Sequence, residues 1–402
     1  MTFANFIDVR RRLRSTLLPR LRQSPQSLLA STSWAAVTII ALAAAAPAAA
    51  MPTTALAAPV PAPEPELHLS IALELSTEQS NSAALVGRII RTEVLESGDK
   101  LDISQRVSRL RKELGANYIS PAQTMGFQLA SNEITLSETS RYITNTKLLT
   151  TAQAAYRFYW SRAATVGVWG IGAGAEALRI DTEPDSAPYL REFVQRHGKN
   201  SRTIPVTAFW LSDRRQANRI LPEGHLDRLN TEWGTGLGSV SYAKIDFQHS
   251  SYFAMSPRLS TGFSANLGAI RGLGGDLTPL TKRYFGGGVG TVRGYEASAL
   301  TPTDTAQSGI GANRQAVATV EALWHAFSVG ETPVIFSAFA DAGKFADVGS
   351  SKVANSTSVS AKSYGLGISM PVRIGLVRFS FAKPVDAEWR TQRFQFEARA
   401  NW

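Results

Sequence analysis

The chain has 402 residues, of which 44% are hydrophobic and 18% charged, with a formal net charge of +10 and no cysteine. This length allows two ordinary soluble domains or one large all-β domain, and the lack of cysteine excludes disulfides, thiolate metal sites and cysteine nucleophiles. Residues 1–57 hold six arginines and one acidic residue, so the remainder has 36 basic and 31 acidic residues and a charge of only +5, which does not indicate a nucleic-acid surface.

The N-terminal segment has the pattern of an export signal. Its arginines precede the apolar run "AAVTIIALAAAA", Ala35–Ala46, and the small-residue site Ala55-Leu56-Ala57. We therefore predict a signal peptide over residues 1–57, with cleavage after Ala48-Ala49-Ala50 as the alternative site. A membrane anchor is the other interpretation, which the short, Ala-rich core disfavours because a spanning helix needs about 20 residues. Residues 58–65 are proline-rich and predicted to be extended.

From residue 66 onward, apolar and polar residues alternate. Examples are "LHLSIALEL", which begins at Leu67, and the closing "RFQFEARANW", which begins at Arg393. Such alternation fits a soluble antiparallel sheet with one wet face or a transmembrane barrel with a polar lumen. Small residues on the polar face, aromatics at segment ends and the predicted export signal favour the membrane. The sheet must then close, because an open edge in lipid leaves backbone groups unpaired.

The predicted fold is an all-β transmembrane antiparallel barrel over residues 66–402. The alternation gives sixteen segments: 66–78, 84–96, 100–110, 112–121, 126–140, 147–160, 164–180, 202–213, 222–235, 238–252, 256–270, 314–328, 332–345, 362–371, 375–385 and 391–402. The segment "ISQRVSRLRKELG" also fits an amphipathic helix, with Ile103, Val107, Leu110 and Leu114 on one face and Gly115 as its stop. That helix stays open as an alternative to two strands.

A long loop is predicted from about Arg271 to Arg314, and loops of this length are usually functional or disordered. It contains "KRYFGGGVGTVRGYEASAL", Lys282–Leu300. A glycine cluster suggests a phosphate-binding loop, but this one lacks the G-K-[ST] ending and no strand–helix unit frames it. The glycines instead allow positive φ and a close approach to another surface.

The segment "RYFGGGVGTVRGY" resembles the sixth extracellular loop motif of the outer-membrane insertase and translocase barrels of the BamA/TamA type, also called surface-antigen barrels. The motif residues here are Val292, Arg293, Gly294 and Tyr295. Further matches follow the family's order: a strand junction through Asp213, Pro222 and Gly224; the acidic residue Glu321; "FSAFADAGKF" with Asp341; and a C-terminal signal with Phe394, Phe396 and Trp402. The resemblance extends from about Glu66 to Trp402.

The resemblance implies that the loop folds into the lumen and that its arginine docks on carboxylates of the inner wall. The alternation agrees, because it places Asp341 with Phe339 and Gly343, and Glu321 with Thr319, on the inward faces of their strands. A guanidinium offers a planar fork that matches carboxylates. Without the resemblance, Arg293 would be interpreted as a solvated loop residue.

The resemblance also implies a location in the bacterial outer membrane, no enzymatic activity, and a role in insertion or translocation of polypeptides. A passive pore or an anchor barrel without translocase activity is the alternative. Expected partners are outer-membrane lipids and either client polypeptides or a separate periplasmic POTRA-type or assembly protein. Residues 58–66 are too few for a POTRA domain, so none is expected within this sequence.

No cofactor, metal or nucleic acid is predicted. The five histidines are scattered, with no acidic or histidine partner at ligand spacing: His68, His197, His225, His249 and His325. No G-x-S-x-G elbow or serine–histidine arrangement occurs.

Overall fold

The computed structural model describes most of the chain from Leu67 onward. The described residues are 67–76, 82–95, 98–108, 111–121, 127–143, 146–181, 186–216, 220–237, 239–347, 358–372, 375–386 and 388–400. The predicted signal peptide, the proline-rich segment 58–65 and Trp402 lie outside them.

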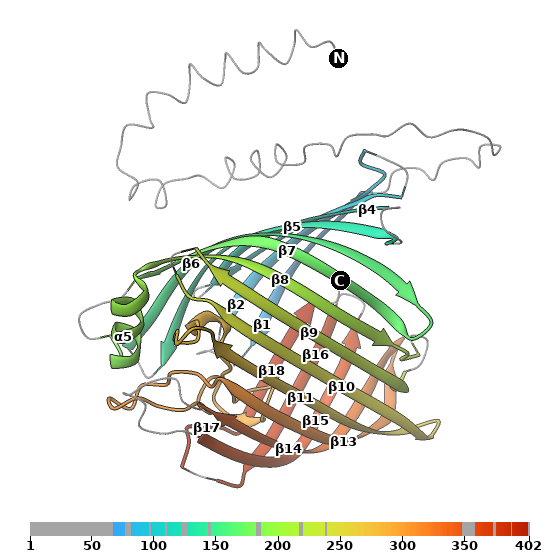
Figure 1. The fold of residues 1–402 in the computed structure, drawn as a ribbon. Helices are drawn as coiled ribbons and strands as arrows, with labels where there is room; N and C mark the ends of the chain where they lie inside the picture. Colours follow the sequence, from blue (N-terminus) through green and yellow to red (C-terminus); the bar gives the residue numbers. More distant parts are fainter. Residues whose placement is uncertain are drawn as a thin grey trace, which may run out of the picture. The chain divides into compact units, whose positions relative to one another are not determined.

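Within this part of the chain, sixteen antiparallel strands close into one barrel (Figure 1). They are β1 (Leu67–Ser76), β2 (Ser82–Thr92), β3 (Lys100–Ser108), β4 (Arg111–Pro121), β5 (Leu129–Ile143), β6 (Thr146–Ala164), β7 (Gly167–Asp181), β8 (Asn200–Asp213), β9 (Gly224–Gly236), β10 (Tyr242–Ser256), β11 (Leu259–Gly272), β13 (Arg314–Val329), β14 (Thr332–Ala346), β15 (Ser358–Val372), β16 (Gly375–Pro384) and β18 (Phe394–Ala400). The predicted all-β class and the sixteen-strand count are confirmed.

The helix considered for residues 103–114 is wrong. β3 and β4 are strands, and β3 pairs with β2 on one side and β4 on the other. The local periodicity of the sequence fits a helix or two strands, and the backbone pairing of β3 with β2 and β4 decides for the strands. A helix here would remove the partners of β2 and β5 and leave their backbone groups without hydrogen bonds.

The two faces of the wall differ as the alternation requires. Outward positions carry exposed apolar side chains, such as Val320, Leu366 and Phe381. Inward positions on β7 are small because large neighbours lie over them: a Cβ on Gly172 would come within 2.4 Å of the Tyr159 ring. The described residues include no helix that is long and apolar enough to cross a membrane.

The barrel has a loop end and a turn end. The connection 273–313 and the connection that contains Pro188–His197 lie at the loop end, whereas 165–166, 257–258 and 330–331 are two-residue turns at the opposite end. Outer-membrane barrels have short periplasmic turns and longer extracellular loops. The loop end is therefore the extracellular one.

An unpredicted helix, α5 (Pro188–His197), lies in the connection between β7 and β8 at the loop end (Figure 1). Pro188 occupies its first turn and Gly198, with φ 78°, ends it, which are usual boundary signals. Tyr189, Leu190 and Phe193 are buried in one cluster with Leu277, Leu280 and Ile310 of the connection 273–313. The helix therefore packs against that loop.

His197 joins α5 to the same loop. The backbone N–H of Leu277 donates to its Nε2 at 3.4 Å, and Nδ1 lies 3.9 Å from the Asp276 carboxylate. Burial lowers the pKa of His197 below its ordinary value of 6.5, although Asp276 acts in the opposite direction. The folded state thus favours the neutral imidazole, which accepts the Leu277 hydrogen bond.

The docking of α5 should weaken as the pH falls. Because the folded pKa is lowered, the contribution of His197 is fully present above about pH 6.5 and is lost as the pH falls below that value. We expect amide hydrogen exchange in α5 to accelerate from pH 7.5 to pH 5.5, after correction for intrinsic rates. His197→Gln should remove this pH dependence and His225→Gln, at the turn end, should retain it. Equal pH dependence in His197→Gln would contradict the assignment.

Candidate functional site: the inserted loop

The connection between β11 and β13, residues 273–313, is folded into a packed structure and is called the inserted loop here. It contains the 3₁₀ turn η1 (Leu280–Lys282) and the short strand β12 (Gly294–Tyr295). β12 pairs with β17 (Thr391–Gln392) from the connection between β16 and β18. Val292, Tyr295 and Leu300 are fully buried in a cluster with wall residues Phe345 and Val359.

Arg293 binds Asp341 of β14 through both its side chain and its backbone. The guanidinium Nε and Nη2 each lie 2.8 Å from one oxygen of the Asp341 carboxylate, and the Arg293 backbone N–H donates to it at 3.0 Å. The Thr319 hydroxyl donates to the same carboxylate at 2.9 Å. The guanidinium carbon lies 3.4 Å from the centre of the Phe339 ring. This pair is buried and bidentate, and the Asp341 carboxylate accepts four hydrogen bonds, which is the geometry in which such pairs are strong.

Glu321 of β13 contacts the same arginine less closely. Its carboxylate is 3.9 Å from Nη1 of Arg293, and it accepts a 3.3 Å hydrogen bond from the Tyr252 hydroxyl. The structure therefore brings together the arginine and both carboxylates named from the sequence. Asp341 is the direct partner, and Glu321 adds negative charge at the edge of the site.

The other motif residues fit the wall through close contacts. A Cβ on Gly343 would lie 2.6 Å from the Val292 side chain, so the wall needs a glycine there. Gly294 has φ 91°, a conformation that favours glycine. The Tyr295 hydroxyl lies 2.9 Å from the backbone oxygen of Lys362, and its carbonyl accepts a 2.8 Å hydrogen bond from Gln395.

Arg283 is a second buried anchor, which the sequence analysis missed. It lies 2.8 Å from the Asp347 carboxylate, and the two side chains are 0% and 1% exposed. Arg283 also donates to Tyr189 of α5 at 2.6 Å and to the backbone oxygen of Gly311 at 2.7 Å. The sequence did contain a signal for its partner. Asp347 lies six residues after Asp341, so the alternation along β14 places both on the inward face, with Asp347 just past the end of the strand.

Lys282 forms a third anchor on a different part of the wall. Its ammonium lies 2.9 Å from Glu176 of β7 and 3.0 Å from Glu232 of β9. Arg157 of β6 lies 3.4 Å from both carboxylates. Two successive loop residues, Lys282 and Arg283, thus bind carboxylates at separate places on the barrel, and Arg293 binds a third.

The remaining residues named from the sequence lie away from these anchors. Asp213 ends β8 at the turn end, where it accepts hydrogen bonds from Arg215 at 2.7 and 2.9 Å. Gly224 begins β9 with φ 100°, and the carbonyl of Pro222 accepts a bond from Ser260 at 2.8 Å. Phe394 is exposed on the outer face of β18, and Phe396 lies against Phe379. The structure thus leaves these as separate wall and turn positions.

A closed barrel with an apolar outer belt, and with its longest loop fixed to charged residues of the inner wall, defines a class of outer-membrane protein. Residues 94–399 match the Omp85 superfamily domain, and the chain belongs to this superfamily. The protein is an Omp85-family β-barrel of the bacterial outer membrane. Because the family's barrels serve assembly and transport, the expectation that the chain is not an enzyme is confirmed.

Two curated relatives are outer membrane protein assembly factors BamA. The chain is 24% identical over 263 residues to that of Neisseria meningitidis serogroup B, covering 56% of this chain and 33% of the relative. It is 27% identical over 240 residues to that of Nitratidesulfovibrio vulgaris, covering 58% and 29%. The chain thus spans about a third of the length of these relatives.

Solved structures support the same fold. The barrel resembles BamA from Haemophilus ducreyi lacking POTRA domains 1–3, with a TM-score of 0.69, 15% identity, and coverage of 82% of this chain and 69% of that one. It resembles CdiB from Acinetobacter baumannii with a TM-score of 0.55, 10% identity, and coverage of 84% and 60%.

Removing the Arg293 side chain should destabilise the barrel and release the loop. Arg293→Ala leaves the Asp341 carboxylate buried without its cation, and breaking a buried pair in this way costs about 3–5 kcal/mol. We expect a lower denaturant midpoint, and faster proteolysis within the inserted loop. Arg293→Ala/Asp341→Asn should recover part of the loss, since the orphaned charge is removed.

The matched control is Arg390→Ala. Arg390 pairs with Glu296 of the same loop at 3.2 Å, but both side chains are exposed, so the change should cost less than about 1 kcal/mol. Unchanged gel heat-modifiability and unchanged loop proteolysis in Arg293→Ala would contradict the anchoring role.

Proposed function

We propose that this barrel takes part in inserting or translocating polypeptides at the outer membrane. The observation that supports this most is the narrow seam between its terminal strands. Among the described residues, β1 pairs with β18 only through Leu75–Ala398 and Ser76–Glu397, whereas ten residue pairs join β1 to β2. Seven residue pairs join β16 to β18 on the other side.

A short seam gives a polypeptide a place to pair. Backbone groups in lipid need hydrogen-bond partners, so a strand edge with few pairs is a site where an incoming strand gains the most by pairing. Strand addition of this kind supplies affinity through the main chain and tolerates different sequences. This suits a protein that handles several client polypeptides, and the curated relatives carry the name assembly factor.

The anchored loop contributes to the same proposal. Val292, Arg293, Gly294 and Tyr295, docked on Asp341 and Glu321, would hold the inner wall in shape while the terminal strands part. The domain plan we propose with it is a signal peptide over 1–57, a proline-rich segment over 58–65 and the barrel over 66–402. A separate periplasmic POTRA-type or assembly protein is the partner that would deliver clients.

A passive pore or an anchor barrel is the second candidate. The loop argues against a wide pore, because Lys282, Arg283 and Arg293 fasten it to several parts of the wall. Conductance in planar bilayers that rises sharply in Arg293→Ala would be consistent with this plugging role.

Locking the seam tests the proposal. The chain has no cysteine, so Leu75→Cys/Ala398→Cys introduces a single pair at directly opposed positions, within the Cα range of a disulfide. We expect oxidation to lower the levels of other outer-membrane proteins or secreted polypeptides in cells that depend on this variant, and reductant to restore them.

The control is Leu73→Cys/Leu85→Cys, which links β1 to its constant partner β2. This pair should leave client levels unchanged under both conditions. A deletion strain with normal levels of every outer-membrane protein and secreted polypeptide would instead support the pore or anchor.

A further inference from the structure

Five cationic side chains form a row on the outer surface of the barrel, one on each of five consecutive strands. They are Arg271 on β11, Arg314 on β13, Lys344 on β14, Lys362 on β15 and Lys383 on β16. All five are exposed, and those on β14, β15 and β16 alternate along the strand with buried, lumen-facing neighbours. We call these residues the outer cationic row.

The strand register places the five residues in one diagonal line. Arg314 is opposite Ala269, two residues along β11 from Arg271, and Lys344 is opposite Ala316, two residues along β13 from Arg314. The next two steps have the same offset: Lys362 is opposite Ala342, and Lys383 is opposite Tyr364. Diagonal neighbours of this kind on one face lie about 7–8 Å apart.

The line follows the rim of the barrel. The strands are tilted, so positions at one membrane depth shift along the register from strand to strand. The strand ends shift in the same direction as the row: β13 begins opposite Ala269, three residues before the end of β11, and β16 ends opposite Ser363, five residues after the start of β15. The five charges therefore lie at a similar depth, near the loop end.

Within the part of the chain that the structure describes, no carboxylate pairs with the row. The five strands contain only two acidic residues, Glu321 and Asp341, and both contact Arg293 in the lumen. Among the described residues, none of the five row side chains has a carboxylate partner. Just below the row, the outer face is apolar, with Leu267, Val320 and Phe381 exposed. Charges at this position face the headgroup layer, and the apolar band faces the acyl chains.

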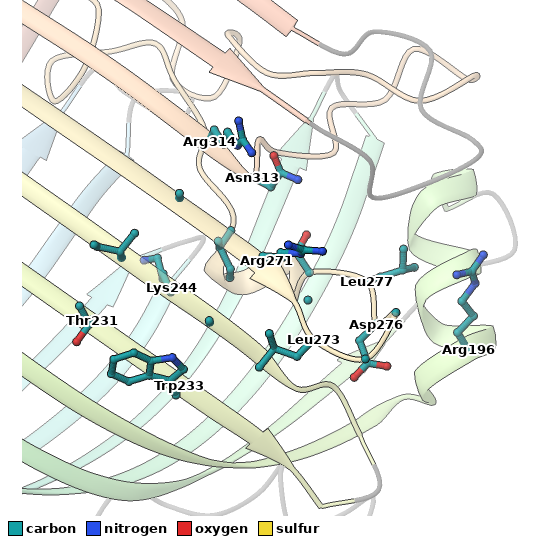
Figure 2. A pocket seen from close by; sticks show the side chains of 18 residues that line it. Arg196, Thr231, Trp233, Lys244, Arg271, Leu273, Asp276, Leu277, Asn313 and Arg314 are labelled. Carbon is teal, nitrogen blue, oxygen red and sulfur yellow. The ribbon is translucent and has the colours of Figure 1, made fainter.

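A cavity of about 1010 Å³ marks one end of the row (Figure 2). Arg271 and Arg314 line it together with the exposed apolar side chains of Trp233, Ile245 and Leu273. Asp276 also lines it, and its carboxylate accepts a 2.9 Å hydrogen bond from the backbone N–H of Ser241. Figure 2 shows Arg271 and Arg314 at the ends of their strands, with Trp233 on β9, which β10 separates from β11. Two guanidinium groups beside apolar surface provide the polarity of a lipid headgroup and its acyl chains.

We propose that the outer cationic row binds anionic phosphorylated lipid of the outer leaflet, with the lipid phosphates on the arginines and lysines and the acyl chains along the apolar face. Arginine forks bind phosphate oxygens bidentately, and lysines act as point charges. A row of charges without acids selects anionic headgroups over zwitterionic ones. Because the row covers β11 and β13–β16, the lipid would hold the wall that carries Asp341 and leave the β1–β18 seam free.

The test is binding of a diphosphorylated, acylated glucosamine disaccharide to the full barrel in detergent micelles, followed by native mass spectrometry. Each cation near an anionic headgroup contributes about 1 kcal/mol, so Arg271→Gln/Arg314→Gln should weaken binding about thirty-fold. Lys344→Gln/Lys362→Gln should do the same on separate strands. Binding by both variants with the wild-type affinity would overturn the proposal.

Two controls separate this site from general lipid binding. Arg162→Gln/Arg258→Gln removes two exposed arginines at the turn end, beside the other leaflet, and should change affinity less than twofold. The same lipid without its phosphates should bind wild type about as weakly as the row variants. Equal binding of the dephosphorylated lipid, or an equal effect of Arg162→Gln/Arg258→Gln, would refute a phosphate-specific row.

A competition experiment with inorganic phosphate tests whether the site needs the lipid chains. It should not compete at concentrations where the lipid saturates the barrel, because it lacks the acyl contacts. Full competition by phosphate would indicate an anion site without a lipid role. Heat-modified gel mobility confirms that each variant is folded, and since all substituted side chains are exposed, we expect folding to be retained.

Discussion

The buried pair of Arg293 and Asp341 fixes the relation between the inserted loop and the wall. Neither charge is stable alone in a partly desolvated lumen, so each depends on the other, and the backbone N–H of Arg293 and the hydroxyl of Thr319 complete the carboxylate's hydrogen bonds. Once this pair forms, Val292 is held so close to β14 that Gly343 has no room for a side chain. The position of this part of the loop and the glycine at position 343 therefore depend on one interaction.

Two further anchors make the loop a brace across the lumen. Lys282 binds carboxylates of β7 and β9, while Arg283 binds Asp347 beyond β14 and reaches α5 through Tyr189. The seam between β1 and β18 lies outside this braced region, and within the described residues it has two residue pairs. The anchored loop stiffens one side of the barrel, and the short seam lies on the other. β1 and β18 can therefore separate locally while the other strands stay hydrogen-bonded to their neighbours.

The sequence predicted the parts that depend on local alternation. The alternation of apolar and polar residues predicted the strands and the inward direction of Asp341 and Glu321. The glycines before Arg293 indicated that the loop backbone approaches another surface closely. It did not predict Lys282 and Arg283 as anchors, because their partners Glu176, Glu232 and Asp347 come from distant segments that only barrel closure brings together. α5 was missed because ten residues with three buried side chains give a weak helical signal between two long strands.

In the described part of the chain, the loop cations on the inner face of the barrel have carboxylate partners, whereas the cations of the outer cationic row do not. Inside, each loop cation meets a carboxylate, because a cation in a narrow protein-lined space has no other source of negative charge. Outside, the row from Arg271 to Lys383 has no carboxylate partner among the described residues, although the same five strands hold two acids on the inner face. Exposed cations of this kind attract anions from their surroundings, and at the rim of an outer-membrane barrel the lipid headgroups supply them. Lipid headgroups thus supply the negative charge for the outer cations, as Asp341 and Asp347 do for the loop arginines inside. Both sets of contacts involve β14 or its end.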